Sequence, residues 1–253
     1  MAEVLFEQRD GVALVTLNRP ARRNALSSTL LAALVGTLTE LDAEAEVRAI
    51  VLTGADPAFC AGLDLTELGR SDSQLAAAGS RPVLPPLTTP LIGAVNGAAV
   101  TGGLELALAC DFLIASERAT FADTHARLGI MPGWGMTYAL PEAVGVRRAR
   151  QLRATGNFID ASTAFGWGLV NHVVPHAELL EFTLGLAAAV AGNDTAAVQA
   201  LFATYREQVV GANAVEIENR ARARWHAAGI DRAEVARRRD GVIERGRSQA
   251  GAG

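Results

Sequence analysis

A single carboxylate inside an otherwise apolar segment is the side chain best placed to do chemistry. Glu105 lies between Leu104 and Leu106, and residues 107–110 are alanine, leucine and cysteine. This pattern predicts a helix that is apolar nearly all round, which is typical of a buried helix. Because burying an unpaired carboxylate is costly, Glu105 must have polar partners or hold a proton. Glu105 is therefore a candidate acid or base; the alternative is a structural glutamate bonded to a neighbouring loop.

Two consecutive glycines, Gly102 and Gly103, open this predicted helix. The first N–H groups of a helix have no partner within it, and the positive end of the helix dipole lies there. Without β-carbons, the backbone lets a ligand oxygen approach closely. The segment therefore offers backbone donors to a negatively charged oxygen, with an acid close behind them. The alternative is a tight turn between a strand and a helix.

Composition excludes several other classes of chemistry and partner. The chain has 253 residues and a net charge of -4, which gives no general attraction for nucleic acid or an anionic membrane. All 23 basic residues are arginine, so a mechanism through a Schiff-base lysine is excluded. Cys60 and Cys110 are too few for a disulfide framework, and their apolar surroundings are typical of reduced core thiols.

Neither a metal site nor a membrane anchor has support in the sequence. The four histidines are scattered, and no Cys-x-x-Cys or His-Glu-x-x-His motif occurs. The N-terminus lacks the basic flank and apolar block of a signal peptide, and no apolar run approaches the ~18 residues of a membrane span. We therefore expect a cytoplasmic protein that binds no metal.

The elements that must position Glu105 alternate between strands and helices. Asp10 and Gly11 separate two strand-like runs and predict a hairpin. A stripe of leucines after Ser27 or Ser28 predicts a capped helix that extends to about Glu44. Strand, helix and strand in this order favour parallel pairing and the α/β class. We expect strands at residues 4–9, 12–17, 47–53, 91–95, 112–115 and 169–174.

The pattern changes to helices alone near Gly192. The last helices carry few large apolar residues among many charges, so they lack a core of their own. We expect a main body at 1–191 and a helical region at 192–253 that packs on this body or on a neighbouring subunit. The expected helices begin at about 136 and then cover 146–154, 161–165 with Asp160 as the cap, 177–191, 195–209, 214–228 and 232–245.

Six groups of short segments together resemble the crotonase superfamily, which contains enoyl-CoA hydratases and isomerases. Their order and spacing match over about residues 3 to 245. The resemblance implies a superhelix of ββα turns and a C-terminal α-helical region used for trimerisation, in a homotrimer or a dimer of trimers. It also implies an acyl-CoA thioester substrate, with no separate cofactor. The segments are Leu17–Pro20 with Asn24–Leu26, Phe59–Leu65, Ala94–Gly97 with Gly102–Leu106, Ala109–Asp111, Leu128–Gly133 and Gly168–Asn171.

The resemblance assigns an oxyanion hole to the backbone N–H groups of Ala61 and Gly102. This suits the chemistry, because a thioester carbonyl gains negative charge when a nucleophile adds at C3 or a base removes a neighbouring proton, and fixed donors stabilise that charge. Arg22 or Arg23 falls where the family contacts CoA phosphates; a solvated arginine is the alternative. Further substrate or CoA contacts are implied at Cys60, Leu63, Asp64, Gly133 and Trp134, of which Trp134 lines the acyl pocket or packs in the core.

His125 is the main departure from the family pattern. Hydratases of this family use two glutamates that bind one water; Glu105 matches the first, and His125 stands where the second is expected. A neutral imidazole accepts a water proton and an imidazolium donates one to C2, so either role is possible. Asp123 could supply a carboxylate only if the loop is remodelled. Alternatively, His125 fills the acyl pocket or sets its specificity.

We weigh three functions for these residues; other crotonase-type reactions, such as hydrolysis or C–C cleavage of an acyl-CoA, stay open. The leading one is hydration of a trans-2-enoyl-CoA to a 3-hydroxyacyl-CoA, with Glu105 activating water and His125 assisting. The second is migration of the double bond of an enoyl-CoA, for which one carboxylate suffices. The third is binding of acyl-CoA with little or no turnover, which the missing second glutamate favours and the buried Glu105 opposes.

Overall fold

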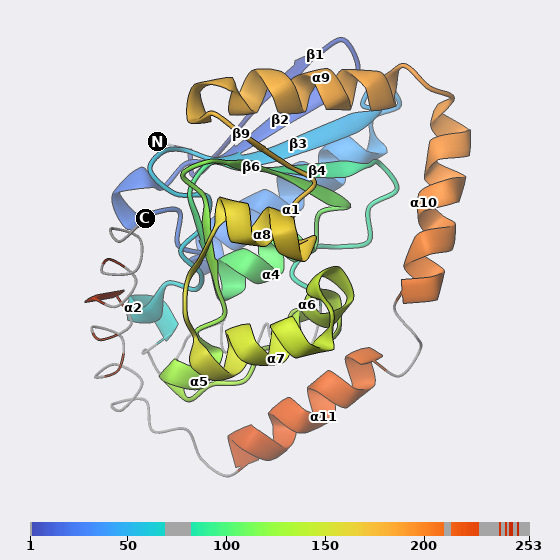
Figure 1. Ribbon diagram of the computed structural model, residues 1–253. Coiled ribbons are helices and arrows are strands. Elements are labelled where there is room, and N and C mark those ends of the chain that lie inside the picture. Colours follow the sequence, from blue (N-terminus) through green and yellow to red (C-terminus); the bar gives the residue numbers. More distant parts are fainter. Residues whose placement is uncertain are drawn as a thin grey trace.

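The computed structural model describes residues 2–68, 82–209 and 214–227, together with residues 238, 241, 243, 244 and 247. It has the predicted α/β architecture, with a central mixed sheet, helices on both faces and two long helices at the periphery (Figure 1). Of the predicted helix at 232–245, residues 238, 241, 243 and 244 are described and are helical, and the rest lies outside the described residues. The sequence also predicts a surface segment at 71–86, rich in serine, alanine, glycine and proline, of which residues 71–81 lie outside the described residues. The division of the chain at residue 192 stays a prediction.

The central sheet has six strands in the order β1-β2-β3-β4-β6-β9. The predicted hairpin is confirmed, because β1 and β2 pair antiparallel, and all other neighbours pair parallel. The third strand starts two residues later than predicted, and the last is shorter than the predicted 169–174. The strands are β1 (Val4–Arg9), β2 (Val12–Leu17), β3 (Ala49–Gly54), β4 (Leu91–Val95), β6 (Phe112–Ser116) and β9 (His172–Val174).

Both faces of this sheet are covered, so its inner strands are mostly apolar. In β3, Ile50 and Leu52 belong to the main core, which includes the leucines of α1 (Ser28–Ala43). Ala49 and Val51 point to the opposite face, which packs against α9 (Leu179–Ala191). Helix α1 begins as predicted, because the Ser27 side chain accepts a hydrogen bond from the Leu30 amide at 3.1 Å.

A second sheet of three short strands was not predicted. Its order is β5 (Ala98–Val100), β7 (Thr120–Ala122) and β8 (Ile159–Asp160). Strands of three residues or fewer are too short to show a periodic pattern. The strands β5 and β7 are parallel neighbours, and each leads into a short helix, α4 (Gly102–Leu108) and α5 (His125–Leu128). Because parallel strands end at the same edge, this pairing brings Glu105 and His125 together.

The remaining helices surround this core. In Figure 1, α10 and α11 run along the outside of the molecule, away from the central sheet. No single described helix has the length and apolar composition of a membrane span; one bent pair, His176–Ala191 with Thr195–Tyr205 at 105°, meets that test jointly. The other helices are α2 (Leu65–Leu68), α6 (Met136–Val144), α7 (Val146–Thr155), α8 (Ala161–Trp167), α10 (Thr195–Val209) and α11 (Ala214–Ala227), with 3-10 turns at Pro20–Arg22 and His176–Glu178.

Candidate active site

The carboxylate of Glu105 is buried and bound by backbone amides. Its side chain is only 3% exposed. Oε1 accepts hydrogen bonds from the Trp134 amide at 2.9 Å and the Met136 amide at 3.5 Å. These amides lie at the start of α6, where the helix dipole also favours a negative charge. Amide donors stabilise the ionised form of a carboxylate, so this arrangement suits a base.

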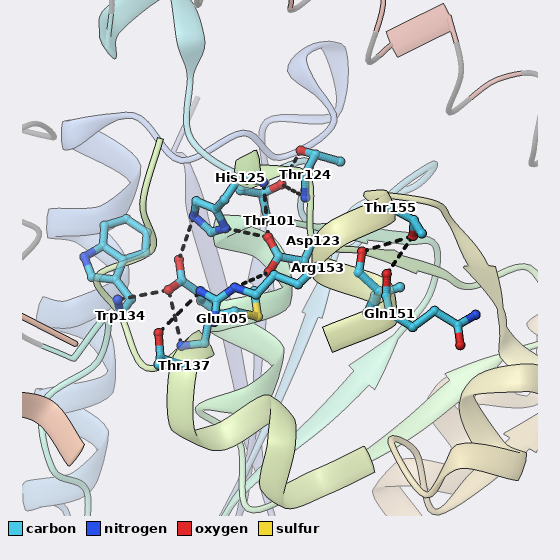
Figure 2. A network of polar contacts seen from close by, with 12 residues as sticks. Thr101, Glu105, Asp123, Thr124, His125, Trp134, Thr137, Gln151, Arg153 and Thr155 are labelled. Atoms are coloured by element: carbon cyan, nitrogen blue, oxygen red, sulfur yellow. Dashed lines mark hydrogen bonds and ion pairs between the residues drawn. The ribbon is translucent and has the colours of Figure 1, made fainter. Parts of the chain in front are cut away.

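His125 lies between Glu105 and a second buried carboxylate. Its Nδ1 is 2.7 Å from Oδ1 of Asp123, and its Nε2 is 3.7 Å from Oε2 of Glu105 (Figure 2). The His125 amide also donates to Oδ1 of Asp123 at 3.1 Å. One edge of the imidazole is therefore held by Asp123, and the other faces the candidate base.

The surroundings of His125 favour the imidazolium. Burial by itself lowers the pKa of His125, but the hydrogen bond to Asp123 and the charges of Glu105 and Asp123 outweigh it and raise the pKa above 6.5. Burial likewise opposes ionisation of Asp123, yet the bond to His125 and the charges of His125 and Arg153 lower its pKa below 3.8. The two groups therefore stabilise each other as an ion pair, which leaves an N–H of His125 directed at Glu105.

The turns that carry these side chains are tied together by two threonines. Thr101 precedes α4 and Thr124 precedes α5, and their hydroxyl oxygens lie 2.5 Å apart. The Thr124 amide also donates to the Thr101 hydroxyl at 3.2 Å. Thr101 has a positive φ of 55°, which is uncommon for a residue with a branched side chain. These bonds hold the unusual turn and fix the spacing of Glu105 and His125.

The structure corrects the predicted use of the Ala61 amide. Its N–H donates to the carbonyl oxygen of Arg23 at 3.0 Å, so it is not available to a ligand. The N–H of Leu63, unlike that of Ala61, points away from the neighbouring segment at residues 23–26. Leu26 bonds to the carbonyl of Gly62 at 2.8 Å and the amide of Asp64 at 2.9 Å, so the intervening Leu63 amide points to the opposite side.

The Leu63 amide lies next to the amide of Gly102. A β-carbon placed on Gly102 would be 3.5 Å from the Leu63 nitrogen, and one placed on Gly62 would be 3.4 Å from the Gly102 nitrogen. Gly102 is the first residue of α4, so its N–H has no acceptor within the helix. Gly102 was predicted as one of two oxyanion-hole donors; the amide that lies beside it is that of Leu63, two residues from the predicted Ala61.

Comparison with known proteins now decides the family. The enoyl-CoA hydratase/isomerase family model matches residues 7–249. The chain belongs to the enoyl-CoA hydratase/isomerase family. A probable enoyl-CoA hydratase of Rhizobium meliloti (strain 1021) is 43% identical over 192 residues, which are 74% of this chain and 75% of that protein.

Solved structures confirm the crotonase fold for this member of the enoyl-CoA hydratase/isomerase family. The crystal structure of an enoyl-CoA hydratase from Mycobacterium smegmatis has a TM-score of 0.83 at 44% identity, covering 90% of this chain and 100% of that one. A monofunctional enoyl-CoA isomerase from M. smegmatis has a TM-score of 0.70 at 34% identity, covering 85% of this chain and 98% of that one.

Other residues that the family resemblance assigned to substrate or CoA have different surroundings. Arg22 and Arg23 are exposed, and the bond from Ala61 to Arg23 places this turn beside the amide pair. Asp64 forms an ion pair with Arg19 at 3.2 Å, so its carboxylate has a structural partner within the protein. Cys60 is fully buried in the core, and burial raises the pKa of its thiol to about 12.

Trp134 packs in the core, which is one of the two roles that the sequence left open for it; the other, lining the acyl pocket, stays a prediction. The side chain belongs to the main core, and Trp134 is 7% exposed. A β-carbon on Gly102 would be 3.3 Å from Cζ3 of this ring, so the ring also forms a wall beside the amide pair. Its neighbour Gly133 is half-buried. The backbone amide of Trp134, which binds Glu105, was not predicted, because side-chain type does not show where an amide points.

Asp123 does not replace the missing glutamate. It turns toward His125, and its Oδ2 lies 3.4 Å from Nε of Arg153. Arg153 was not singled out by the sequence. The only signal was its position in the basic helix predicted at 146–154, where solvated arginines are the ordinary interpretation.

Proposed function

We propose that the protein hydrates a trans-2-enoyl-CoA to a 3-hydroxyacyl-CoA. The observation that carries this proposal is the adjacent pair of amides, Leu63 and Gly102, near a buried acid–base pair, Glu105 and His125. Membership of the family, and relatives whose names describe enoyl-CoA hydratases, support the same reaction.

In this mechanism the thioester carbonyl oxygen accepts hydrogen bonds from the amides of Leu63 and Gly102. Addition of water at C3 moves charge onto this oxygen, and the two donors stabilise the resulting enolate. Rigid backbone donors need no reorganisation as the charge develops, and each contributes on the order of 10²–10³ in rate.

Glu105 and His125 divide the proton transfers. Glu105 acts as the base, because its amide partners stabilise the carboxylate, and it removes a proton from water as the oxygen bonds to C3. His125 acts as the acid and gives its Nε2 proton to C2 of the enolate. The proton held by Glu105 then passes to His125, whose Nε2 is 3.7 Å away, and this restores both groups. The net change is addition of one water across the double bond.

The remaining parts of the proposal follow the family resemblance. Arg22 or Arg23 contacts CoA phosphates, since both side chains are exposed beside the amide pair. Trp134 bounds the acyl group. Amide donors stabilise the enolate without a metal or redox cofactor, so we propose that none takes part. We further propose a cytoplasmic homotrimer or dimer of trimers, in which the helices at the periphery contact neighbouring subunits.

Double-bond isomerisation is the second candidate. The likeness to the isomerase from M. smegmatis favours it, and so does the presence of a single glutamate, because one base can move a proton between C4 and C2. His125 distinguishes the two proposals: hydration uses it as an acid, whereas isomerisation through Glu105 alone leaves it without a chemical role.

A panel of enoyl-CoA substrates tests these alternatives. With crotonyl-CoA and longer 2-enoyl-CoA thioesters, a hydratase removes the conjugated-thioester absorbance and incorporates oxygen from labelled water. With 3-enoyl-CoA thioesters, an isomerase creates that absorbance and incorporates none. Tight acyl-CoA binding by calorimetry with no turnover of either substrate would refute both and identify a binding protein.

A further inference from the structure

We propose that Asp123 and Arg153 form a positioning pair that holds His125 as the acid of this site. The inference rests on the proposed function and extends it to two residues that touch no reacting atom. It also explains how a histidine can act as the acid where the family uses a glutamate: a carboxylate and an arginine hold the imidazole in place.

Asp123 fixes the orientation of the imidazole. It is 0% exposed, and its Oδ1 accepts from both Nδ1 and the backbone amide of His125, at 2.7 and 3.1 Å. Two bonds from one oxygen to one residue hold the ring relative to its own backbone. Because an ionised carboxylate only accepts, Nδ1 must carry a hydrogen, and the tautomer or charge state of the ring follows from this. Nε2 is left facing Glu105.

Arg153 supports Asp123 and connects the two halves of the site. Oδ2 of Asp123 is buried and makes no hydrogen bond within the described part of the chain, so the guanidinium 3.4 Å away supplies its compensating charge. Nη2 of Arg153 donates to the hydroxyl of Thr137 at 3.3 Å. Thr137 follows Met136, whose amide contacts Glu105. One arginine on α7 thus contacts both the partner of the acid and the helix that holds the base (Figure 2).

The charges around His125 act in opposite directions. Asp123 adjoins it from the turn before α5, Glu105 faces it from α4, and Arg153 lies behind Asp123 on α7. Burial lowers the pKa of His125, the two carboxylates raise it, and Arg153 lowers it. Removing the charge of Asp123 should therefore lower this pKa, and removing the charge of Arg153 should raise it. If the two substitutions only loosened the structure around His125, they would not shift its pKa in opposite directions.

The test compares Asp123→Asn and Arg153→Gln with wild type in the hydration of crotonyl-CoA. We expect kcat of Asp123→Asn to fall on the order of 10²-fold, with KM changed less than about threefold, because the partner that sets the tautomer is lost. The alkaline limb of the pH profile of kcat/KM should move to lower pH by about one unit or more, because the pKa of His125 falls. Arg153→Gln should lower kcat about tenfold and move the same limb upward.

Arg150→Gln is the matched control, because Arg150 is exposed on the same helix. It should leave kcat, KM and the pH profile unchanged. Wild-type kcat and pH profile in Asp123→Asn would overturn the proposal, as would limbs that move in the same direction in both variants. If circular dichroism shows that Asp123→Asn does not fold, Arg153→Gln decides alone, and an unmoved limb refutes the proposal.

Histidine ring titration by NMR separates this inference from the proposed function. The chain has four histidines, so the signal of His125 can be assigned by its loss in His125→Gln. A His125 pKa above 6.5 in wild type that is lower in Asp123→Asn supports the positioning pair. If, in addition, no enoyl-CoA is hydrated, only the proposed function fails. An active hydratase whose His125 titrates identically in wild type and Asp123→Asn refutes the positioning pair alone.

Discussion

Replacing Gly102 with alanine tests the proposed oxyanion site with little risk to the fold. The new β-carbon would lie 3.5 Å from the Leu63 nitrogen and 3.3 Å from Cζ3 of Trp134. It would thus occupy space beside both amides, where the thioester oxygen must sit about 2.7–3.1 Å from each nitrogen. Only the edge of the Trp134 ring must give, by a few tenths of an ångström.

The expected effect is a catalytic loss without a loss of stability. If the methyl group displaces the oxygen from one donor, kcat/KM falls on the order of 10²–10³-fold, or about 2.7–4 kcal/mol of transition-state stabilisation. Gly102 is the first residue of α4 and has no positive φ, and alanine is the better helix former by about 1 kcal/mol or less. The free energy of unfolding should therefore stay within about 1 kcal/mol of wild type.

The assay combines crotonyl-CoA hydration with denaturant unfolding, and Gly103→Ala is the contrasting variant. A β-carbon on Gly103 would overlap the carbonyl oxygen of Cys60, so this neighbouring substitution should destabilise the protein. Full activity in a folded Gly102→Ala protein would refute the placement of the thioester oxygen between Leu63 and Gly102. Equal destabilisation by both substitutions would show that the contacts of Gly102 are tighter than the structure indicates.

Three further predictions concern the acid–base pair. Glu105→Gln keeps the shape of the side chain but removes the base, so kcat should fall on the order of 10²–10⁴-fold; an unchanged kcat with crotonyl-CoA would exclude Glu105 as the base. His125→Gln should lower kcat for hydration on the order of 10²–10⁴-fold yet spare any isomerase activity, which parallel assays with 2-enoyl- and 3-enoyl-CoA check. The pKa of His125 is raised from 6.5 in the folded state, so the contribution of His125 to stability is complete below pH 6.5 and is lost as the pH rises through the raised pKa. The pKa of Asp123 is lowered from 3.8, so the contribution of Asp123 is complete above pH 3.8 and is lost as the pH falls through the lowered pKa. The difference in unfolding free energy between wild type and His125→Gln should therefore shrink above pH 6.5, and a difference that grows there would contradict the ion pair.

Local sequence was sufficient for the elements with strong patterns. The hairpin at Asp10–Gly11 and the cap at Ser27 follow from turn residues and capping groups, which act over a few residues. The parallel pairing of the inner strands follows from their alternation with helices, whereas the order of the strands in the sheet was not predicted. The burial of Glu105 was also predictable, because the apolar residues around it leave α4 no solvent-facing side. The short strands β5, β7 and β8 carry too few residues for such a pattern.

Only the tertiary structure decided which groups meet. The direction of the amides of Ala61 and Leu63 depends on pairing with Arg23 and Leu26, about 40 residues earlier in the chain, and no side chain reports it. Likewise, Asp123 and Arg153 come together because α7 packs against the turn that carries His125. Residue types determined which chemistry was available here, whereas the directions of backbone bonds and the packing of distant helices determined which atoms can perform it.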